Sequence, residues 1–315
     1  MITEYRSYYR PFEYPEAYDM YRKQQMVHWT KDEIKLAQDI QDWNRDITTG
    51  EKNVVGGILK GFTQMEILVG DYWRKVAEWF PKPEVAMMAS AFSYFESIHM
   101  DNYAMINEEL GLDDFKAFLH DEKTKAKLDH FSEVPEIYSI SDIAASLAIF
   151  SAYAEGCILF SSFAVLLSFQ KENLLKGISQ IVNYSIRDEN LHSLGGIYLF
   201  NTLCKENPSI RGGLREQIYE AAKVTRDLEF AFIDQLFTED SIRTLTKEQL
   251  KNFITHRINM KTKELGYEPQ FYVDPELLKE MSWFDELSSG QKFGDFFAVR
   301  VSDYTDKTFK AEDLF

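Results

Sequence analysis

The chain has little of the residues that interrupt regular structure, and almost no cysteine. Its 315 residues include only 8 Pro, 15 Gly and 2 Cys. So little Pro and Gly favours long regular elements over many turns. Cys157 and Cys204 are too few for a disulfide scaffold and do not have the spacing of a zinc site. The N-terminus lacks the basic-then-apolar pattern of a secretory signal, so we expect a cytoplasmic protein.

Positive charge is also scarce. The 35 Lys and Arg residues stand against 51 Asp and Glu, which gives a formal net charge of -16 at pH 7. Nucleic acids and anionic membranes bind clustered cations, so we expect neither as a partner. Hydrophobic residues make up 45% of the chain and aromatic residues 15%, with 24 Phe and 17 Tyr. A chain of this length and composition can bury a large core.

Helical periodicity and end signals recur along the whole sequence. Apart from two central helices, they predict helices over residues 15–27, 31–45, 53–80, 84–110, 113–129, 212–237, 246–265 and 275–288. Thr30 is a candidate N-cap for the second of these, and Gly111 suits the C-cap of the fourth. Because strand-like alternation and repeats are missing, we predict an all-α fold with one domain over 1–290. Residues 291–315 are expected to form a mobile tail.

The longest stretch with hardly any charge runs from Ile143 to Gln170, with Glu155 as its single ionisable side chain. It is long enough to span a bilayer. A carboxylate near the membrane centre, five Ser residues and flanks with Asp142 on one side and only Lys171 on the other argue against that interpretation. A helix buried on all sides within a bundle explains the pattern better, and the lone buried carboxylate then needs a compensating positive charge.

Two Glu-x-x-His pairs lie in apolar helical segments: Glu96 with His99, and Glu189 with His192. Residues i and i+3 lie on one face of a helix, so each pair can bind one metal ion. Each pair also needs a carboxylate from a neighbouring helix. Glu155 is the only candidate in its own helix. The alternative is that the histidines are ordinary core residues, the glutamates lie on the surface, and their spacing is a coincidence.

The remaining carboxylate must come from residues 53–80. Glu66 is the better candidate, because the apolar residues Phe62 and Val69 share its side, and Asp71 is the fallback. Four helices that contribute Glu, Glu-x-x-His, Glu and Glu-x-x-His have the layout of di-iron and di-manganese carboxylate bundles. Four carboxylates with two neutral imidazoles also balance the charge of two divalent ions.

With these motifs the chain resembles the small, radical-generating subunit of class I ribonucleotide reductase over nearly its full length. Tyr103 follows the first Glu-x-x-His by four residues, and Arg187-Asp188-Glu189-x-x-His192 matches the second metal motif of the family. The segment 23–29, which ends in Trp29, is similar to the segment with the family's electron-relay tryptophan. Residues 300–304, which end in Tyr304, resemble the tail with its relay tyrosine.

The resemblance implies a ferritin-like bundle that binds two metal ions per chain, iron, manganese or both, through Glu66, Glu96, His99, Glu155, Glu189 and His192. The centre would activate an oxygen species and generate an oxidant, stored as a radical on Tyr103 or in the metal pair. The implied route outward runs through His99, Asp188, Trp29 and Tyr304. The large subunit, docked on the C-terminal tail, would use the oxidant to reduce ribonucleotides to deoxyribonucleotides. A homodimer is also implied.

Two departures from the family pattern concern the first ligand. Most members have Asp where Glu66 stands, and the distance from Glu66 to Glu96 is one residue shorter, which implies a deletion near Pro81. Variant groups that use manganese also differ in whether the tyrosine stores the radical. Tyr103 could instead be a packed helix aromatic, Trp29 core filler and Asp188 a capping residue.

Three rival functions differ in class: a stand-alone di-metal oxidase or hydroxylase, a ferritin-like metal store and a metal-free helical scaffold. An oxidase would need a substrate cavity and no docking tail, and a store would need a shorter chain and an assembly shell. The Trp29 segment and the tail with Tyr304 favour the reductase subunit over all three.

Overall fold

The computed structural model describes residues 1–116, 137–237 and 242–289. Every regular element within these ranges is helical, so the all-α prediction is confirmed. The predicted tail over 291–315, with Tyr304, lies outside the described residues, as does most of the helix predicted over 113–129. The proposed boundary between domain and tail therefore stays a prediction.

The helices follow one another along the chain in three groups. The N-terminal group consists of α1 (Pro15–Met26), the 3₁₀ turn η1 (Lys31–Glu33), α2 (Ala37–Arg45), α3 (Thr49–Trp79) and α4 (Pro83–Glu109). The central group is α6 (Ile140–Leu147), the π-helical η3 (Ala148–Ile158), α7 (Leu159–Ser168), the 3₁₀ turn η4 (Phe169–Glu172) and α8 (Lys176–Glu206). The C-terminal group is α9 (Ser209–Gly213), α10 (Arg215–Leu236), α11 (Lys247–Glu264), α12 (Pro275–Glu280) and α13 (Ser282–Ser289).

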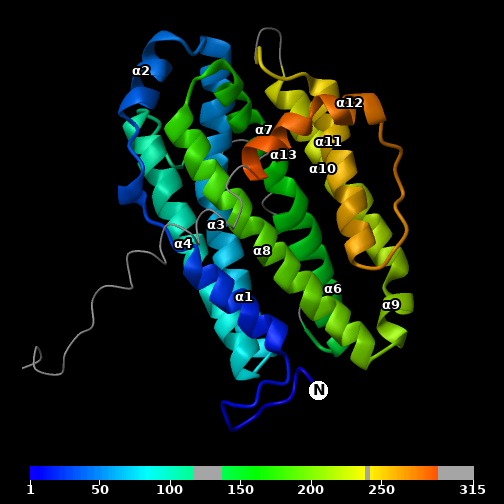
Figure 1. Ribbon diagram of the computed structural model, residues 1–315. Helices are drawn as coiled ribbons and strands as arrows, with labels where there is room; N and C mark the ends of the chain where they lie inside the picture. The colour runs from blue at the N-terminus through cyan, green and yellow to red at the C-terminus, as the bar shows by residue number, and fades with distance from the viewer. Residues whose placement is uncertain (117–136, 238–241, 290–315) are drawn as a thin grey trace, which may run out of the picture.

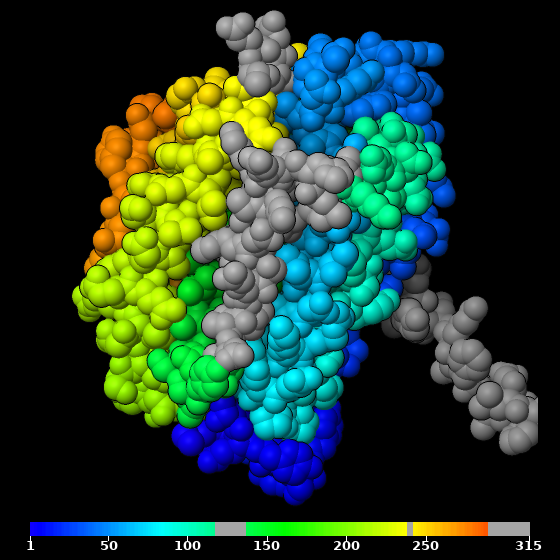
Figure 2. All heavy atoms as spheres, turned by 180° about the vertical axis from the view of Figure 1, so that it is seen from behind, coloured from blue at the N-terminus to red at the C-terminus, as the bar shows by residue number. Residues whose placement is uncertain are grey.

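Four long helical elements pack together into a bundle with the core between them (Figure 1). α3 packs along α4, and α8 packs against the continuous helical segment α6–η3–α7. α10 and α11 cover the side of η3 that faces away from α3. Seen from behind, α3 and α4 (light blue to turquoise) form one side of the surface, and α9 and α10 (yellow-green) form the other (Figure 2).

The central apolar segment is the core helix that the sequence predicts. Ile140–Glu172 is one helical segment apolar and long enough to cross a membrane, and 94% of its most apolar window is buried inside the protein. It comes close to α8, and a Cβ on Gly196 would collide with Ser151 of η3. The π-helical stretch Ala148–Ile158 was not predicted from the sequence. Such π segments occur frequently at functional sites.

The single helix predicted over 31–45 is wrong. The chain forms η1, becomes extended at Ile34 (φ -115°, ψ 134°) and only then starts α2. The break lets α2 cap the N-terminus of α8. Asp39 accepts hydrogen bonds from the amides of Gly177 (3.1 Å) and Ile178 (2.8 Å). These amides have no partner within their own helix. The hydrogen bonds that Asp39 accepts from them offset the helical hydrogen bonds that a shorter α2 lacks.

The other predicted helices agree with the structure within a few residues. α1, α4, α10 and α11 lie where they were expected, and Gly111 adopts φ +71° just past the end of α4. α3 begins earlier than predicted, because Thr48 accepts a hydrogen bond from the amide of Glu51 and caps it. The short C-terminal helix predicted over 275–288 is divided into α12 and α13.

Candidate metal centre

Six predicted ligands from four elements meet in the middle of the bundle. α3 supplies Glu66, α4 supplies Glu96 and His99, η3 supplies Glu155, and α8 supplies Glu189 and His192. All six side chains are 0% exposed. Their ligand atoms form two groups, in each of which all atoms lie within 4.8 Å of one another: Glu66, Glu96, His99 and Glu189 in the first, and Glu96, Glu155, Glu189 and His192 in the second.

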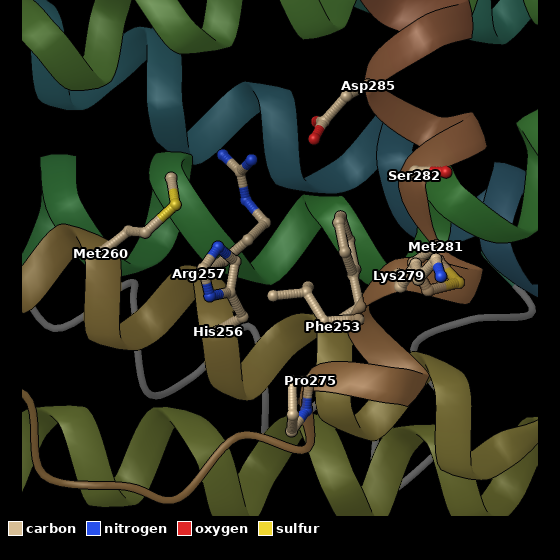
Figure 3. Close-up of a pocket in the computed structure, with 10 residues that line it drawn as sticks. Phe253, His256, Arg257, Met260, Pro275, Lys279, Met281, Ser282 and Asp285 are labelled. Atoms are coloured by element: carbon tan, nitrogen blue, oxygen red, sulfur yellow. The ribbon is translucent and has the colours of Figure 1, made fainter.

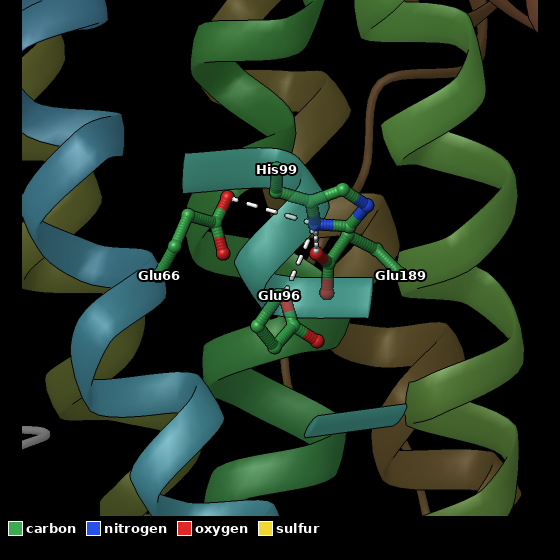
Figure 4. Close-up of side chains that lie close together, drawn as sticks. All are labelled: Glu66, Glu96, His99 and Glu189. Atoms are coloured by element: carbon green, nitrogen blue, oxygen red, sulfur yellow. Dashed lines mark hydrogen bonds and ion pairs between the residues drawn. The ribbon is translucent and has the colours of Figure 1, made fainter. Parts of the chain in front are cut away.

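Glu96 and Glu189 belong to both groups, and each presents one oxygen to each histidine. Glu96 Oε2 lies 3.0 Å from His99 Nδ1, while its Oε1 lies 2.6 Å from His192 Nδ1. Glu189 Oε1 lies 3.2 Å from His99 Nδ1, and its Oε2 lies 3.9 Å from His192 Nδ1. Figure 4 shows the first group converging on His99. Two carboxylates between two imidazoles are placed to bridge a pair of ions.

Glu66 and Glu155 lie on opposite sides of this bridge. Glu66 Oε1 is 3.9 Å from His99 Nδ1 and belongs to the first group only, and Glu155 belongs to the second only. The fallback residue Asp71 does not reach the centre. Its exposed side chain forms an ion pair with Arg74 on the surface of α3. Of the two candidates on α3, the structure thus brings Glu66 into the cluster and leaves Asp71 outside it.

The side chains of the centre suit a pair of cations, because many of their buried polar atoms have no hydrogen-bond partner. The atoms without a partner include both oxygens of Glu66, Glu155 Oε2, Glu189 Oε2 and His192 Nε2. Among the described residues, no Lys or Arg forms an ion pair with these carboxylates. Unpaired buried carboxylates are costly, and two divalent ions would satisfy them.

The pKa values of the carboxyl groups also indicate that the centre needs cations. Burial raises the pKa of Glu66 and of Glu189 to about 8 each. Burial, followed by the neighbouring Glu189 and Glu96, raises the pKa of Glu155 well above its usual range. Burial also disfavours the charged form of Glu96, but His192 and His99 outweigh it and lower its pKa to about 2. Without cations, the cluster therefore retains protons on several of its carboxyl groups.

Asp188 connects the centre to Trp29. Asp188 Oδ2 lies 3.3 Å from His99 Nε2 and accepts a 2.8 Å hydrogen bond from Trp29 Nε1. Its other oxygen accepts from Gln24 (3.1 Å) and from Arg187 (3.2 Å). Burial alone would raise the pKa of Asp188, but Arg187 and His99 hold it below its usual range. The carboxylate thus turns His99 so that Nδ1 faces the centre.

Tyr103 lies one turn beyond His99 on α4, with the two ring centroids 6.5 Å apart. It is 0% exposed, and its hydroxyl donates a 2.8 Å hydrogen bond to Ser185 Oγ. The ring packs against Phe62, which in turn contacts Phe163. Burial raises the pKa of the Tyr103 hydroxyl well above its usual range. Tyr103 is therefore close to the centre, shielded from water and neutral.

Three contacts of the centre were not predicted from the sequence. Trp73 donates a 2.5 Å hydrogen bond to Glu155 Oε1, Gln24 contacts Asp188, and Ser185 contacts Tyr103. Trp73 stands seven residues after Glu66 on α3, which places both on one face of that helix. This spacing is the one signal that could have identified Trp73.

A cavity of about 370 Å³ is lined by residues of α11, α12 and α13. Arg257, His256, Lys279 and Asp285 are among its lining residues (Figure 3). The buried Arg257 guanidinium donates two hydrogen bonds, of 3.0 and 2.9 Å, to the carbonyl oxygen of Gly156. Gly156 follows the candidate ligand Glu155 in η3, so Arg257 holds the backbone beside that residue.

A sequence model of the family described as "Ribonucleotide reductase, small chain" matches residues 6–277. The chain belongs to this family. A probable ribonucleoside-diphosphate reductase small subunit of Invertebrate iridescent virus 6 is 31% identical over 97% of this chain and 95% of its own. The ribonucleoside-diphosphate reductase subunit beta of Chlamydia pneumoniae is 25% identical over 93% of this chain and 88% of its own.

Solved structures share the fold. A putative class I ribonucleotide reductase from Bacillus halodurans has a TM-score of 0.78 at 21% identity, over 87% of this chain and 99% of its own. The dimanganese(II) NrdF of Streptococcus sanguinis has a TM-score of 0.77 at 20% identity, over 88% of this chain and 100% of its own. An R2-like ligand-binding oxidase with a Mn/Fe cofactor has a TM-score of 0.67 at 17% identity, over 82% of this chain and 95% of its own.

The chain is a small subunit of ribonucleotide reductase, an oxidoreductase that works together with a large subunit. The expected family, ferritin-like fold and enzyme class are confirmed. The buried carboxylates and histidines fit a dinuclear metal site, as the sequence predicts. The role of each residue remains a proposal, developed below.

Proposed function

We propose that this chain holds two metal ions in the centre and produces there the oxidant with which the large subunit reduces ribonucleoside diphosphates. The observation that carries the proposal is the pair of overlapping donor groups that share Glu96 and Glu189. Glu96 and Glu189, together with His99 and Glu66 on one side and His192 and Glu155 on the other, would hold the two ions.

When bound, the two ions supply the one-electron redox chemistry that the side chains of the centre lack. The chain supplies the ligands, their orientation and a dry surrounding. The ring of Phe92 lies 4.4 Å from that of His192, and Phe62 and Phe163 pack beside Tyr103. These fully or almost fully buried aromatic side chains keep water away from the oxidant.

The ligand set suits iron and manganese. Carboxylates and imidazoles bind both metals, whereas the thiolates that select softer ions are missing from the two donor groups. The Streptococcus sanguinis neighbour is a dimanganese(II) protein, and the oxidase neighbours contain a Mn/Fe cofactor. We therefore propose two ions per chain, iron, manganese or one of each.

Tyr103 is the proposed store of the oxidising equivalent. Its ring lies one turn from the ligand His99, and Ser185 accepts the hydrogen bond of its hydroxyl. A tyrosyl radical forms when the side chain loses one electron and its phenolic proton. In the alternative, the oxidising equivalent stays at the metal centre and Tyr103 only packs there.

The proposed route outward starts at His99 and leads through Asp188 to Trp29. Continuous hydrogen bonding between these three side chains supports it. Trp29 is 2% exposed, and His99 and Asp188 are 0% exposed, so this part of the route is buried throughout. The further step to Tyr304, and the docking of the large subunit on the tail over 291–315, are proposed from the family resemblance. A homodimer and a cytoplasmic location are proposed on the same basis.

Metal analysis combined with reductase assays tests this function. The chain loaded with Fe(II), Mn(II) or both is expected to bind two ions. It should support deoxynucleotide formation only when the large subunit is present. Loaded chain that binds two ions but supports no turnover with the large subunit under any loading would refute the reductase assignment.

A stand-alone oxidase on the same fold is the second candidate, favoured by the likeness to R2-like ligand-binding oxidases. Such an enzyme needs a substrate cavity at its metal centre. None of the six side chains of the centre is among the residues that line the cavity of Figure 3. Capture of a large subunit by the intact chain, and its loss on deletion of residues 300–315, would favour the reductase over the oxidase.

A further inference from the structure

Trp73 is the only side chain that donates a hydrogen bond to Glu155 among the described residues. Its indole Nε1–H lies 2.5 Å from Glu155 Oε1, and both side chains are 0% exposed. Glu155 Oε2 has no hydrogen-bond partner. One oxygen of this ligand is therefore held by the protein, and the other is free for a cation.

The indole itself is firmly placed. Its ring meets Phe92 edge to face, with centroids 4.8 Å apart, and lies 6.1 Å from the ring of His192. Phe92 also lies against His192, with centroids 4.4 Å apart. Trp73 is thus packed against the histidine that shares a donor group with Glu155, and it cannot turn its N–H elsewhere without disturbing that packing.

Glu66, the corresponding carboxylate on the other side of the centre, has no such restraint. Among the described residues, neither of its oxygens has a hydrogen-bond partner, so both are available to a cation. The protein therefore treats the two outer carboxylates differently. Glu155, on the side of His192, has one oxygen held by a hydrogen bond, and Glu66, on the side of His99, has neither.

We propose that Trp73 is a positioning residue that holds Glu155 as a one-oxygen ligand and thereby makes the two metal positions unequal. The proposal rests on the metal centre proposed above and adds the residue that sets its asymmetry. Partners that orient a metal ligand typically change metal affinity or activity by 10–100-fold when they are removed. Loss of the indole N–H is therefore expected to weaken binding at one position of the two.

Two substitutions separate the hydrogen bond from the volume of the side chain. Trp73→Phe retains most of the aromatic volume but loses the donor. Trp73→His retains a ring N–H but loses more volume. Trp79→Phe, at the end of the same helix, is the matched control. Each full-length chain is stripped of metal and titrated with Mn²⁺, and affinity is measured by calorimetry and the ion pair by electron paramagnetic resonance.

Wild type and Trp79→Phe are expected to bind two Mn²⁺ per chain with the same spectrum. Trp73→Phe should bind one ion about 10-fold or more weakly and give a different spectrum of the ion pair. Trp73→His should recover much of that affinity. Unchanged affinity and spectrum in Trp73→Phe would overturn the proposal. Weaker binding by Trp73→His than by Trp73→Phe would also overturn it, because side-chain volume and not the ring N–H would then determine the affinity. Wild type without Mn²⁺ binding would refute the metal centre itself.

A measurement on the unsubstituted side chain is independent of how the variants fold. The chain contains 5 Trp, and ¹⁵N labelling of the indoles makes each ring N–H visible by nuclear magnetic resonance. One indole proton should lie far downfield, exchange slowly with water and move upfield in Glu155→Ala. If Glu155→Ala shifts no indole signal, Trp73 does not hold Glu155.

Discussion

Trp29 and His99 meet at a single oxygen atom. Asp188 Oδ2 accepts the indole N–H of Trp29 at 2.8 Å and lies 3.3 Å from His99 Nε2. The two ring centroids are 5.9 Å apart. A candidate metal ligand and a buried indole ring are thus connected through one carboxylate, whose second oxygen is held by Gln24 and Arg187.

Asp188→Asn should separate metal binding from transfer of the oxidant. The amide has the size of the carboxylate but not its charge, so His99 and Trp29 lose the shared anionic acceptor. We expect two metal ions per chain and a deoxynucleotide-forming activity lower by on the order of 100-fold. Asp188→Asn with normal turnover alongside the large subunit would contradict the proposed route. Exposed Asp71→Asn is the control and should leave turnover unchanged.

Glu155→Ala should remove a ligand from the second donor group. Glu96, Glu189 and His192 would remain there with one carboxylate fewer, so the metal content should fall well below two per chain. Atomic absorption or mass spectrometry of reloaded protein measures this. If the variant still binds two ions at full occupancy, Glu155 is not part of the site.

Tyr304→Phe should abolish turnover with the large subunit while the metal centre stays intact. The substitution removes the phenolic proton whose loss accompanies one-electron oxidation of tyrosine. The expected result is two metal ions per chain, unchanged binding of the large subunit and no deoxynucleotide product. Normal product formation by Tyr304→Phe would show that the tail relay is wrong.

The buried ion pair of Arg6 and Glu84 should make stability depend on pH. The two side chains approach to 2.5 Å at 3% and 0% exposure. Burial alone would raise the pKa of Glu84, but its hydrogen bonds with Arg6 lower it below the usual 4.5. A lowered folded-state pKa adds stability above pH 4.5 that is lost as the pH falls through the folded-state value.

Glu84→Gln should therefore lower the free energy of unfolding by about 3 kcal/mol at neutral pH. Urea unfolding of both proteins at neutral pH and below pH 4.5 measures the difference, which should shrink in acid. Asp71→Asn, at an exposed ion pair, should change the free energy of unfolding by less than about 1 kcal/mol at either pH. A Glu84→Gln effect that is equal at both pH values would contradict this account.

The clustered candidate ligands could be selected from the sequence because their signals are local. Glu96 and His99 share a helix face through their spacing alone, and the same holds for Glu189 and His192. Glu155 stands out because an isolated carboxylate in an apolar helix is costly without a partner. These features do not depend on how the helices are placed relative to one another.

What the sequence did not predict depends on contacts between distant elements. The end of η1 and the late start of α2 follow from the capping of α8 by Asp39. The hydrogen bond from Trp73 joins α3 to a π-helical segment, and neither that segment nor the contact itself has a sequence pattern. Neither helix periodicity nor motif spacing reports such contacts.

Metal analysis together with electron paramagnetic resonance tests the central claim most directly. The chain is loaded with Fe(II), Mn(II) or both, exposed to oxygen or to superoxide, and compared with Tyr103→Phe. We predict two ions per chain and an oxidant-dependent signal under at least one loading. A tyrosyl signal that disappears in Tyr103→Phe assigns the store to Tyr103, and a signal that persists assigns it to the metal centre. Fewer than two ions per chain under every loading, or spectra unchanged by exposure, would contradict the account.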